Sequence, residues 1–501
     1  MRTDLPTSNN EMRNVYVIGV GMTKFEKPGA DSSRDYPEMV QEGVTKALND
    51  AKITYKEIEH AVVGYIYGGT CCGQRSLYPI GLTGIPIFNV NNACASGSSA
   101  LYLGKALIET GRCHTVLVVG FEKMARGSLE NMSAAVDDRT NPMDQHIGVM
   151  AETYGLHAAP ITAQMFGNAA KEHMEKYGTR REHFARIAQK NHRHSVNNPY
   201  AQFRKEYSLD EIINARKIYD FMGLLECSPT SDGAAAVVLC SKHFLAKHPH
   251  LYPQAVEIVG MEMGTDQPSV FAEKSNIKMI GFDLIKTISE RLYKRTGLTP
   301  SDVQVIELHD CFAPNELITY EALGLCPVGK GREIVDRNDN TYGGRWVINP
   351  SGGLISKGHP IGATGVAQVV ELCSQLRGTC GKRQVPNCRI AMQHNIGIGG
   401  AGLVALYRLA GDGLTSNLDM KNKENQFVSD AVFDEIKRRS SEESETIREV
   451  NSTFRINLTH GPSDAKKSWV IDCKQLPPFI GQRDGPVDVE VTMKDADFML
   501  L

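Results

Sequence analysis

A cysteine in this sequence stands where a thiol becomes reactive. Cys94 lies in Asn-Asn-Ala-Cys-Ala-Ser-Gly-Ser, after the strand-like run Pro86–Val90 and before a helix of small residues. A thiol at a helix N-terminus faces unpaired N–H groups and the positive end of the helix dipole, which favour the thiolate. The same N–H groups can hold a carbonyl oxygen that becomes an oxyanion. Cys94 is therefore a candidate nucleophile; the alternative is a small buried thiol in a tight helix–strand contact.

A histidine occupies the matching place in a second glycine-rich segment. His359 lies in the run Asn-Pro-Ser-Gly-Gly-Leu-Ile-Ser-Lys-Gly-His-Pro-Ile-Gly-Ala-Thr-Gly, which begins at Asn349. So many glycines predict a folded-back loop whose backbone closely approaches another group. The helix after this loop resembles the helix after Cys94, and a cysteine paired with a histidine is an activated nucleophile. We expect the two side chains to face one cavity; the alternative is a structural Gly-His-Pro turn.

Two further segments place polar groups at the ends of strands. His309-Asp310-Cys311-Phe312 follows the buried strand Val305–Leu308, and ligand sites in open α/β sheets favour such carboxyl ends. If the strand geometry persists, His309 and Cys311 point the same way; otherwise they are a structural histidine and a core thiol. Residues 393–400, Gln-His-Asn-Ile-Gly-Ile-Gly-Gly, are expected to follow the last strand, where glycines free backbone N–H groups as donors. This run also suits a tight turn between strands.

The elements that must position these residues recur in two parts of the chain. The repeated segments, each given with its counterpart, are 14–22 and 255–263, 50–64 and 297–310, 95–108 and 363–376, and 115–120 and 389–394. Four landmarks in the same order predict two related halves. Strands that are nearly continuous in apolar residues alternate with helices, which predicts an α/β fold of layered sheets covered by helices.

Changes in composition suggest where the parts of the chain begin and end. A segment at about 125–225, rich in Met, His, Asn, Arg and Lys, suits a loop domain inserted into the first half, with helices at 164–177 and 181–194. Residues 411–426 show no hydrophobic periodicity, which is typical of a linker. Within 427–501, one helical face and three runs of alternating apolar residues predict a partial α+β module. The expected boundaries are 1–253 and 254–410 for the two halves, 411–426 for the linker and 427–501 for the module.

The bulk composition limits the classes of function. The 501 residues carry a net charge of −3, with 41% hydrophobic and 23% charged residues, so nucleic acid is not an expected partner. Twelve scattered cysteines without paired zinc spacing indicate a reducing compartment. The sequence contains neither a P-loop nor a dinucleotide fingerprint. The close pair His192 and His194 has no carboxylate or cysteine company, so we expect no metal site.

Four motifs in this order resemble those of a known family. Asn-Asn-Ala-Cys-Ala-Ser-Gly, His-Asp-Cys-Phe, Gly-Gly-Leu-Ile-Ser-Lys-Gly-His-Pro-Ile-Gly-Ala-Thr-Gly and His-Asn-Ile-Gly-Ile-Gly-Gly are similar to the motifs of 3-ketoacyl-CoA thiolases of the sterol carrier protein X type. The resemblance covers about Val15–Tyr407, and the C-terminal module resembles a sterol carrier protein 2 domain. It implies the thiolase fold, in which two duplicated α/β halves stack in layers beneath a loop domain. It also implies a protein that works at least as a homodimer.

The resemblance assigns roles to the three residues with the clearest chemistry. Cys94 matches the nucleophile that takes the acyl group, and His359 matches the base that activates it. His309 matches the polar group that helps to hold the thioester oxygen, where many other thiolases carry Asn.

Three further residues take their roles from the resemblance alone. Other thiolases place an acid/base cysteine in the final glycine loop, where this sequence has none, so the role falls to Cys311. Gly397 matches the glycine whose N–H joins that of the nucleophilic cysteine in an oxyanion hole. Met165 lies where family members contact the pantetheine arm.

The implied reaction is cleavage of a 3-oxoacyl-CoA by free CoA through a cysteine acyl-enzyme. The implied substrates have medium to long chains and include 2-methyl-branched and sterol side-chain forms. CoA is a co-substrate, and no permanently bound cofactor is implied. Three alternatives stay open: a condensing ketoacyl synthase of the same fold, a lipid-transfer protein with an inactive thiolase body, and an inactive scaffold subunit.

The C-terminal residues depart from the family pattern. A complete carrier domain continues past the equivalent of Phe498 with a strand and helices that close a lipid tunnel, whereas this sequence stops near that point. We therefore expect the module to bind lipid or sterol weakly or not at all. The family implies a peroxisomal location, although the chain ends Asp-Phe-Met-Leu-Leu and not in an SKL-type signal.

Overall fold

The chain divides into two compact units, Met1–Gly413 and Leu414–Leu501. The computed structural model describes residues 14–30, 34–125, 140–410, 433, 436, 450–459, 466–475 and 478–494. The linker expected at 411–426 lies outside the described residues. Of the helical face expected in the C-terminal module, only Phe433 and Ile436 are described.

The first half of the larger unit forms five strands. They are β1 (Val15–Met22), β2 (His60–Gly64), β3 (Ile87–Val90), β4 (Thr115–Glu122) and β7 (Gly233–Ser241). In space they follow the order β3-β2-β4-β7-β1. β2 pairs in parallel with β3 and β4, whereas β7 pairs antiparallel with β4 and β1. β4 and β7 are buried along their whole length, as expected of apolar strands covered on both faces.

The second half repeats this arrangement. Its strands are β8 (Val256–Gly264), β9 (Val305–Glu307), β10 (Val347–Ile348), β11 (Ile390–Gly397) and β12 (Ala401–Leu409), in the spatial order β10-β9-β11-β12-β8. The pattern of parallel and antiparallel pairs is also the same. β1 and β8 pair antiparallel at Tyr16–Glu257 and Val17–Val256, which joins the halves into one ten-stranded sheet. The predicted α/β fold of two duplicated halves is confirmed.

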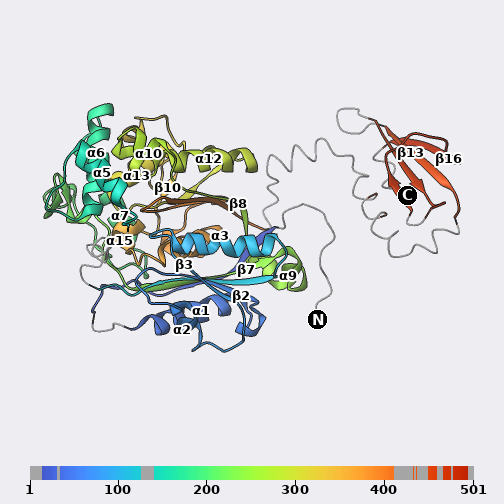
Figure 1. Ribbon diagram of the computed structural model, residues 1–501, viewed down its shortest axis with the longest axis horizontal. Helices are drawn as coiled ribbons and strands as arrows, with labels where there is room; N and C mark the ends of the chain where they lie inside the picture. The colour runs from blue at the N-terminus through green and yellow to red at the C-terminus, as the bar shows by residue number, and fades with distance from the viewer. Residues whose placement is uncertain are drawn as a thin grey trace. The chain divides into compact units, whose positions relative to one another are not determined.

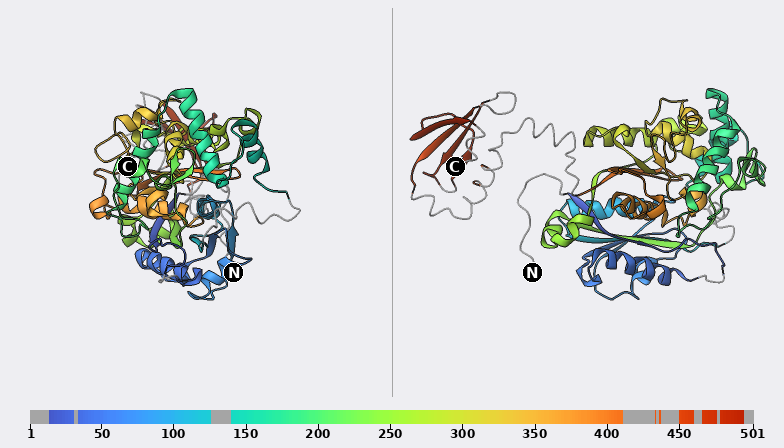
Figure 2. Two further views of the ribbon diagram at one scale, coloured as in Figure 1. Left: turned by 90° about the vertical axis from the view of Figure 1, so that its left-hand side faces the viewer. Right: turned by 180° about the vertical axis from the view of Figure 1, so that it is seen from behind.

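Helices separate and cover the two halves of the sheet in layers. Figures 1 and 2 show α3 (Ser96–Glu109) between the halves, with α1 (Tyr36–Ala51) and α2 (Cys72–Leu77) on one outer face and α12 (Phe282–Thr296) on the other. α16 (Thr364–Leu376) packs against α3 in the middle layer. The buried cluster of this layer draws on both helices and both halves, and includes Leu101, Val237, Val366 and Leu403.

Further helices gather at one end of the layers, where Figure 1 shows α5, α6 and α7. α6 (Ile161–Tyr177) and α7 (Arg181–Ser195) lie where the sequence predicts helices, and both pack on α13 (Ala313–Ala322). The other α-helices and strands that the structure describes in the larger unit are α5 (Asp144–Thr153), α8 (Leu209–Ile213), β5 (Lys217–Tyr219), β6 (Met222–Gly223), α9 (Lys242–Lys247), α10 (Ser269–Ala272), α11 (Asn276–Met279), α14 (Gly331–Asp336) and α15 (Gly353–Lys357).

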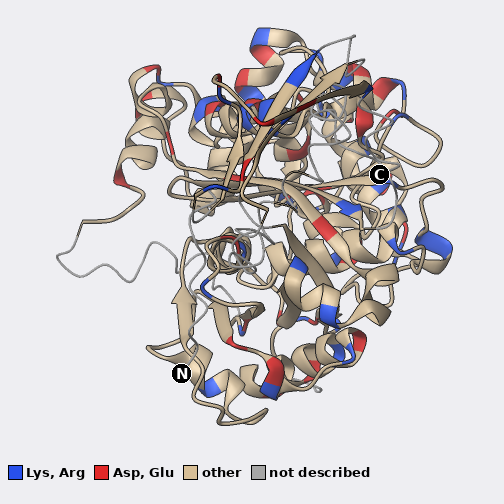
Figure 3. Ribbon diagram, turned by 90° about the vertical axis from the view of Figure 1, so that its right-hand side faces the viewer, with Lys and Arg blue, Asp and Glu red and all other residues tan. Residues whose placement is uncertain are grey.

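Charged residues of both signs are interspersed along the elements, as Figure 3 shows. Some of them join distant parts of the larger unit: Arg408 pairs with Glu257 and Arg377 with Asp50, each at 2.7 Å. Within the described part of the chain, no helix is both long and apolar enough to cross a membrane.

The C-terminal unit contains a four-stranded sheet in the order β15-β14-β13-β16. Its strands are β13 (Thr453–Thr459), β14 (Lys467–Asp472), β15 (Phe479–Gly481) and β16 (Val489–Lys494). Phe433, Leu458 and Ile480 form its buried cluster among the described residues, and Phe433 stacks on Trp469.

Candidate active site

A tight turn between β3 and α3 presents Cys94. Ala93 has a φ of 46°, a left-handed conformation that non-glycine residues rarely adopt and that clusters at functional sites. The N–H of Ala95 donates to the oxygen of Asn92 at 3.0 Å, and the hydroxyl of Ser96 donates to the oxygen of Ala93 at 2.7 Å. These bonds fix the backbone that carries the sulfur, two residues before the first residue of the helix.

The loop between α15 and α16 presents His359. Its backbone N–H donates to the hydroxyl of Ser231 at 2.9 Å, and its Nδ1 lies 2.6 Å from the hydroxyl oxygen of Thr364. The Thr364 hydroxyl donates its proton to the carbonyl oxygen of Pro360 at 3.1 Å. The Thr364 oxygen therefore accepts from Nδ1–H, because its only proton is already used. His359 thus keeps Nε2 unprotonated, which is the form that a base requires.

His309 and Cys311 lie in the turn between β9 and α13. β9 ends at Glu307, so the alternation of a strand does not continue through His309 and Cys311, and that part of the sequence argument is wrong. The turn is held instead by hydrogen bonds: the Asn315 amide donates to the oxygen of His309, and Asp310 accepts from the N–H of Leu354 at 2.7 Å. His309 Nδ1 lies 2.9 Å from the amide nitrogen of Asn395.

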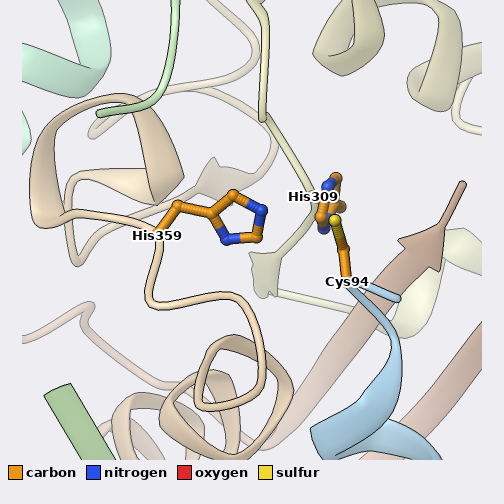
Figure 4. A group of neighbouring side chains, drawn as sticks. All are labelled: Cys94, His309 and His359. Atoms are coloured by element: carbon orange, nitrogen blue, oxygen red, sulfur yellow. The ribbon is translucent and has the colours of Figure 1, made fainter. Parts of the chain in front are cut away.

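The structure brings Cys94, His309 and His359 together, as Figure 4 shows. One atom of each side chain, the sulfur or a ring nitrogen, lies within 4.8 Å of the other two. The two rings meet edge to face with their centroids 5.2 Å apart. Nδ1 of each ring bonds elsewhere, which leaves Nε2 of each ring to act beside the sulfur. Cys94 and His359 come from matching loops, before α3 in one half and before α16 in the other, so the duplicated fold brings them together.

Burial keeps all three groups uncharged in the resting structure. Burial and then the Glu122 carboxylate raise the pKa of Cys94 to about 12, although the N–H groups of Ile398 and of Cys94 itself oppose this rise. Burial lowers the pKa of His359 to about 3 and holds the pKa of His309 well below its usual value. Backbone N–H groups do favour the Cys94 thiolate, as expected, but desolvation outweighs them, so the thiol stays protonated in the resting structure.

Cys311 is a second buried thiol close to the first. Burial raises its pKa well above the usual value, and the nearby Cys94 is the next cause. A raised pKa keeps this thiol protonated, so it carries a proton at a position near Cys94.

The glycine run lies inside β11 and in the turn that follows it. The sequence places residues 393–400 after the last strand, but the strand continues to Gly397, so that placement is wrong. A Cβ atom on Gly397 would lie 2.2 Å from the oxygen of Asn92 and 3.0 Å from the nitrogen of Ala95. Only glycine allows β11 to approach the Cys94 turn this closely. Besides the N–H of Cys94 itself, the N–H of Ile398 is directed at the Cys94 sulfur, and no feature of the sequence indicated that role.

Three family profiles match the chain. Residues 15–243 match the thiolase N-terminal domain, residues 272–405 match the thiolase C-terminal domain-like family, and residues 433–501 match the SCP-2 sterol transfer family. Sterol carrier protein 2 of Oryctolagus cuniculus is 54% identical over 498 residues, which cover 97% of this chain and 90% of the relative. The chain belongs to the thiolase family. It is an acyltransferase that carries a C-terminal module of the sterol transfer family.

Other relatives of this thiolase agree with that assignment. Non-specific lipid-transfer protein-like 2 of Caenorhabditis elegans is 73% identical over 395 residues, covering 79% of this chain and 96% of the relative. The human mitochondrial 3-ketoacyl-CoA thiolase, solved in complex with CoA, has a TM-score of 0.58 at 18% identity and covers 79% of this chain and 98% of that structure. This structural likeness shows the fold.

A buried glutamate of the thiolase joins two segments, 66–67 and the loop at Gly362, to β4 near Cys94. Glu122, at the end of β4, accepts from the N–H groups of Tyr67 at 3.0 Å, Ile66 at 3.2 Å and Gly362 at 3.0 Å. Burial raises the pKa of Glu122 to about 7. The role of Glu122 could not be predicted from the sequence, because its hydrogen-bond partners come from both halves.

Two cavities adjoin the loops that carry Cys94, His309 and His359. A small one of about 20 Å³ is lined by Met165, Gly397 and Ile398, and it has room for roughly one water molecule. A larger one of about 470 Å³ is lined by Cys227, Thr230 and Phe312 among others. Cys227 bridges to Phe312 and Thr230 to His359 through the backbone, so this cavity lies directly against the loops that carry the reactive groups.

Proposed function

We propose that this protein is a 3-ketoacyl-CoA thiolase in which Cys94, His359, His309 and Cys311 carry out the reaction. The observation that carries the proposal is the convergence of the Cys94 sulfur with the rings of His309 and His359 within 4.8 Å. The reaction needs His359 as a base and His309 as a hydrogen-bond donor, both acting through Nε2. The hydrogen bonds that each ring makes at Nδ1 fit these two roles.

In the first half-reaction, the Cys94 sulfur attacks the 3-keto carbon while its proton passes to Nε2 of His359. The bond between C2 and C3 then breaks, and the acyl group stays on the sulfur. The departing electrons form the enolate of the shortened CoA thioester, whose oxygen accepts a hydrogen bond from Nε2–H of His309. Cys311 gives its proton to C2, which completes acetyl- or propionyl-CoA.

In the second half-reaction, the Cys311 thiolate takes the proton of an incoming CoA thiol. The CoA sulfur attacks the acyl carbonyl, whose oxygen becomes negative beside the N–H groups of Cys94, Gly397 and Ile398. The tetrahedral intermediate collapses to acyl-CoA and the Cys94 thiolate, which recovers its proton from His359. His359 and Cys311 thereby return to their starting protonation states. CoA is thus a co-substrate, and the mechanism requires no permanently bound cofactor.

We propose that CoA and acyl-CoA enter through the cavity of about 470 Å³. Its volume lies within the range of small-molecule pockets, and its walls combine the apolar Phe203, Ile218 and Phe312 with the cations Lys27 and Arg216. Cations at the rim suit the phosphates of CoA. Met165 is 1% exposed and lines the small cavity behind the glycine turn. Its proposed contact with the pantetheine arm requires this small cavity to open.

We also propose that two copies associate through β3, and that the family's peroxisomal location applies. β3 lies at one end of the ten-stranded sheet. Phe88 on this edge strand and Leu82 and Tyr102 beside it are 39%, 78% and 41% exposed, which suits an interface. Light scattering should give twice the monomer mass, and Phe88→Asp should give the monomer.

Fluorescence microscopy of the N-terminally tagged chain tests the proposed peroxisomal location.

Trapping of the acyl-enzyme tests the proposed reaction. Wild-type protein mixed with a 3-ketoacyl-CoA without free CoA should gain the mass of one acyl group on Cys94, and added CoA should release it. Cys94→Ala should gain nothing. Cys311→Ala should form the adduct but turn over about 100-fold more slowly, with Cys326→Ala as a control outside the pocket. Full activity in Cys94→Ala would refute the proposal, and a comparison of malonyl-CoA with 3-ketoacyl-CoA separates a condensing synthase.

A further inference from the structure

His309 has one ring nitrogen bound to a neighbour that the proposed reaction does not use. Its Nδ1 lies 2.9 Å from the side-chain nitrogen of Asn395, and both residues are fully buried. An amide N–H can only donate, so Nδ1 must be the unprotonated acceptor and the ring proton must sit on Nε2. This assignment depends on which way the Asn395 amide points, since its oxygen and nitrogen have nearly the same shape.

A chain of buried hydrogen bonds fixes that orientation. The Gln393 nitrogen donates to the carbonyl oxygen of Gly365 at 2.7 Å, and a carbonyl can only accept, so Gln393 cannot be reversed. The same nitrogen reaches the hydroxyl of Ser98 at 3.4 Å. That nitrogen also lies 3.2 Å from the side-chain oxygen of Gln368, so its two protons are shared among three oxygens, and Ser98 faces only a donor on that side. Among the described residues, the acceptor for the Ser98 proton is therefore the oxygen of Asn395, at 3.0 Å. The Asn395 nitrogen is left to face His309. With the amide reversed, Ser98 would meet two donors and have no acceptor for its own proton.

We propose that Asn395, oriented by Ser98 and Gln393, is a positioning residue that keeps His309 as an Nε2–H donor. The two histidines beside Cys94 are then held in opposite forms. Thr364 keeps Nε2 of His359 free to accept, and Asn395 keeps Nε2 of His309 ready to donate. This inference rests on the proposed function, in which His309 holds the enolate oxygen.

The same network protects the catalytic group from metal ions. Cys94, His309 and His359 place one sulfur and two ring nitrogens within 4.8 Å of one another, a ligand set that suits Zn²⁺. A metal needs the unprotonated nitrogen of each ring. While Asn395 donates to Nδ1, His309 can offer Nε2 only by moving its proton to Nδ1, where it would meet the amide N–H. The network therefore disfavours capture of a soft divalent cation.

Asn395→Asp reverses the arrangement with almost no change in shape. One carboxylate oxygen still accepts from Ser98, and the other now accepts from Nδ1–H of His309. Nε2 then turns an unshared pair toward the pocket, as in a carboxylate–histidine–metal relay. Asn395→Leu has a similar size but neither donates nor accepts. Ser98→Ala leaves Asn395 in place and removes the group that orients it.

The test compares the wild-type full chain with these three variants in two assays. In thiolysis with a chelator present, kcat should fall about 100-fold in Asn395→Asp and Asn395→Leu, with a smaller loss in Ser98→Ala. KM should change much less than kcat, because Nε2–H acts on charge that develops during the reaction. In a titration with Co²⁺, Asn395→Asp should show a thiolate-to-cobalt charge-transfer band that wild type lacks at the same concentration. Zn²⁺ should inhibit this variant at about tenfold lower concentration.

The double variant Cys94→Ala with Asn395→Asp is the matched control, and it should lose the cobalt band because the sulfur ligand is gone. Equal cobalt spectra in wild type and Asn395→Asp, or a wild-type kcat in Asn395→Leu, would overturn the inference. If Asn395→Asp fails to fold, the kcat and zinc sensitivity of Asn395→Leu and Ser98→Ala decide the question. The cobalt spectrum needs no turnover, so it still reports on His309 if the wild-type protein proves inactive and the proposed function fails.

Discussion

Each of the three central residues depends on burial as much as on its neighbours. Cys94 is a neutral thiol and both imidazoles are neutral, so the resting protein holds no thiolate–imidazolium pair. In the proposed reaction, His359 therefore takes the proton while the sulfur attacks, and not beforehand. A neutral thiol in a dry pocket is also protected from chance alkylation and oxidation until substrate arrives.

This state makes a prediction about the pH dependence of Cys94. Below a pKa of about 12, the thiolate fraction grows about tenfold for each pH unit. The rate of alkylation by iodoacetamide, followed by peptide mass spectrometry at Cys94, should therefore rise about tenfold per unit from about pH 6 to about pH 10. A plateau at neutral pH would show a preformed ion pair with His359 and would contradict the neutral resting state.

The alkylation assay also tests the effect of the Glu122 carboxylate on Cys94, by comparing wild type with Glu122→Gln. Its carboxylate is the next cause, after burial, of the raised pKa of Cys94, and its own pKa is about 7. Below pH 7 the wild-type group is protonated and carries no charge, so Glu122→Gln should alkylate at the wild-type rate. Above pH 7 the wild-type carboxylate opposes the thiolate, so Glu122→Gln should alkylate faster, and the gap should widen until ionisation is complete. Equal rates at all pH values would remove Glu122 from the electrostatics of Cys94.

At the level of single residues, the sequence predicts groups whose type and local setting carry the signal. Cys94 before a small-residue helix and His359 in a glycine loop are of this kind. The partners Thr364, Ser231, Asn395 and Ile398 were not predicted, because their roles depend on contacts that the fold makes. Glu122 is the clearest case: its bond to Gly362 spans 240 positions of the sequence.

At the level of elements, the repeat of four landmarks predicted the duplicated halves correctly. The errors concern where strands end. Glycines in residues 393–400 indicate a turn, but β11 runs through the first of them. Gly397 must be a glycine because β11 lies against the Cys94 turn. From the sequence alone, a glycine required by such a contact looks the same as a glycine required by a turn. β9, in turn, ends before His309, because Asn315 and Leu354 bind the backbone and side chains of the following turn.

The two halves meet near His359 through backbone contacts that leave no room for a side chain. A Cβ atom on Gly120 in β4 would lie 2.3 Å from the oxygen of Gly362 and 2.9 Å from Cα of Ala363. Both neighbours are backbone atoms of the loop that carries His359, so no rotamer change relieves the overlap. Gly120→Ala should lower the free energy of unfolding by about 1–3 kcal/mol and reduce kcat by displacing His359.

Urea denaturation and steady-state thiolysis measure the two effects. Gly148→Ala is the matched control, because Gly148 lies in α5 with nothing within 4 Å of the added Cβ. In a helix this change should be neutral or stabilise by about 0.5–1 kcal/mol. Equal behaviour of the two variants would show that the close approach at Gly120 does not hold the halves together.

At the level of the whole molecule, the residues assigned to the proposed reaction all belong to the unit Met1–Gly413. In the described part of that unit, the buried cluster contains only Phe433, Leu458 and Ile480. Val489 and Val491 of β16 remain 40% and 39% exposed. Burial of a valine side chain is worth about 1.5–3 kcal/mol, so the described strands leave much of this gain unused.

A lipid site must enclose most of its ligand, commonly about 70–90% of the ligand surface. An exposed strand face offers only one wall, so we expect residues 414–501 to add no saturable lipid binding with a Kd below about 10 µM. Titration of a fluorescent fatty acid into the full chain and into a variant of residues 1–413 measures the difference. Both proteins should bind alike and retain the same thiolysis rate. Binding near 1 µM in the full chain alone would mean that the C-terminal unit closes around lipid, and that its exposed valines become part of the wall.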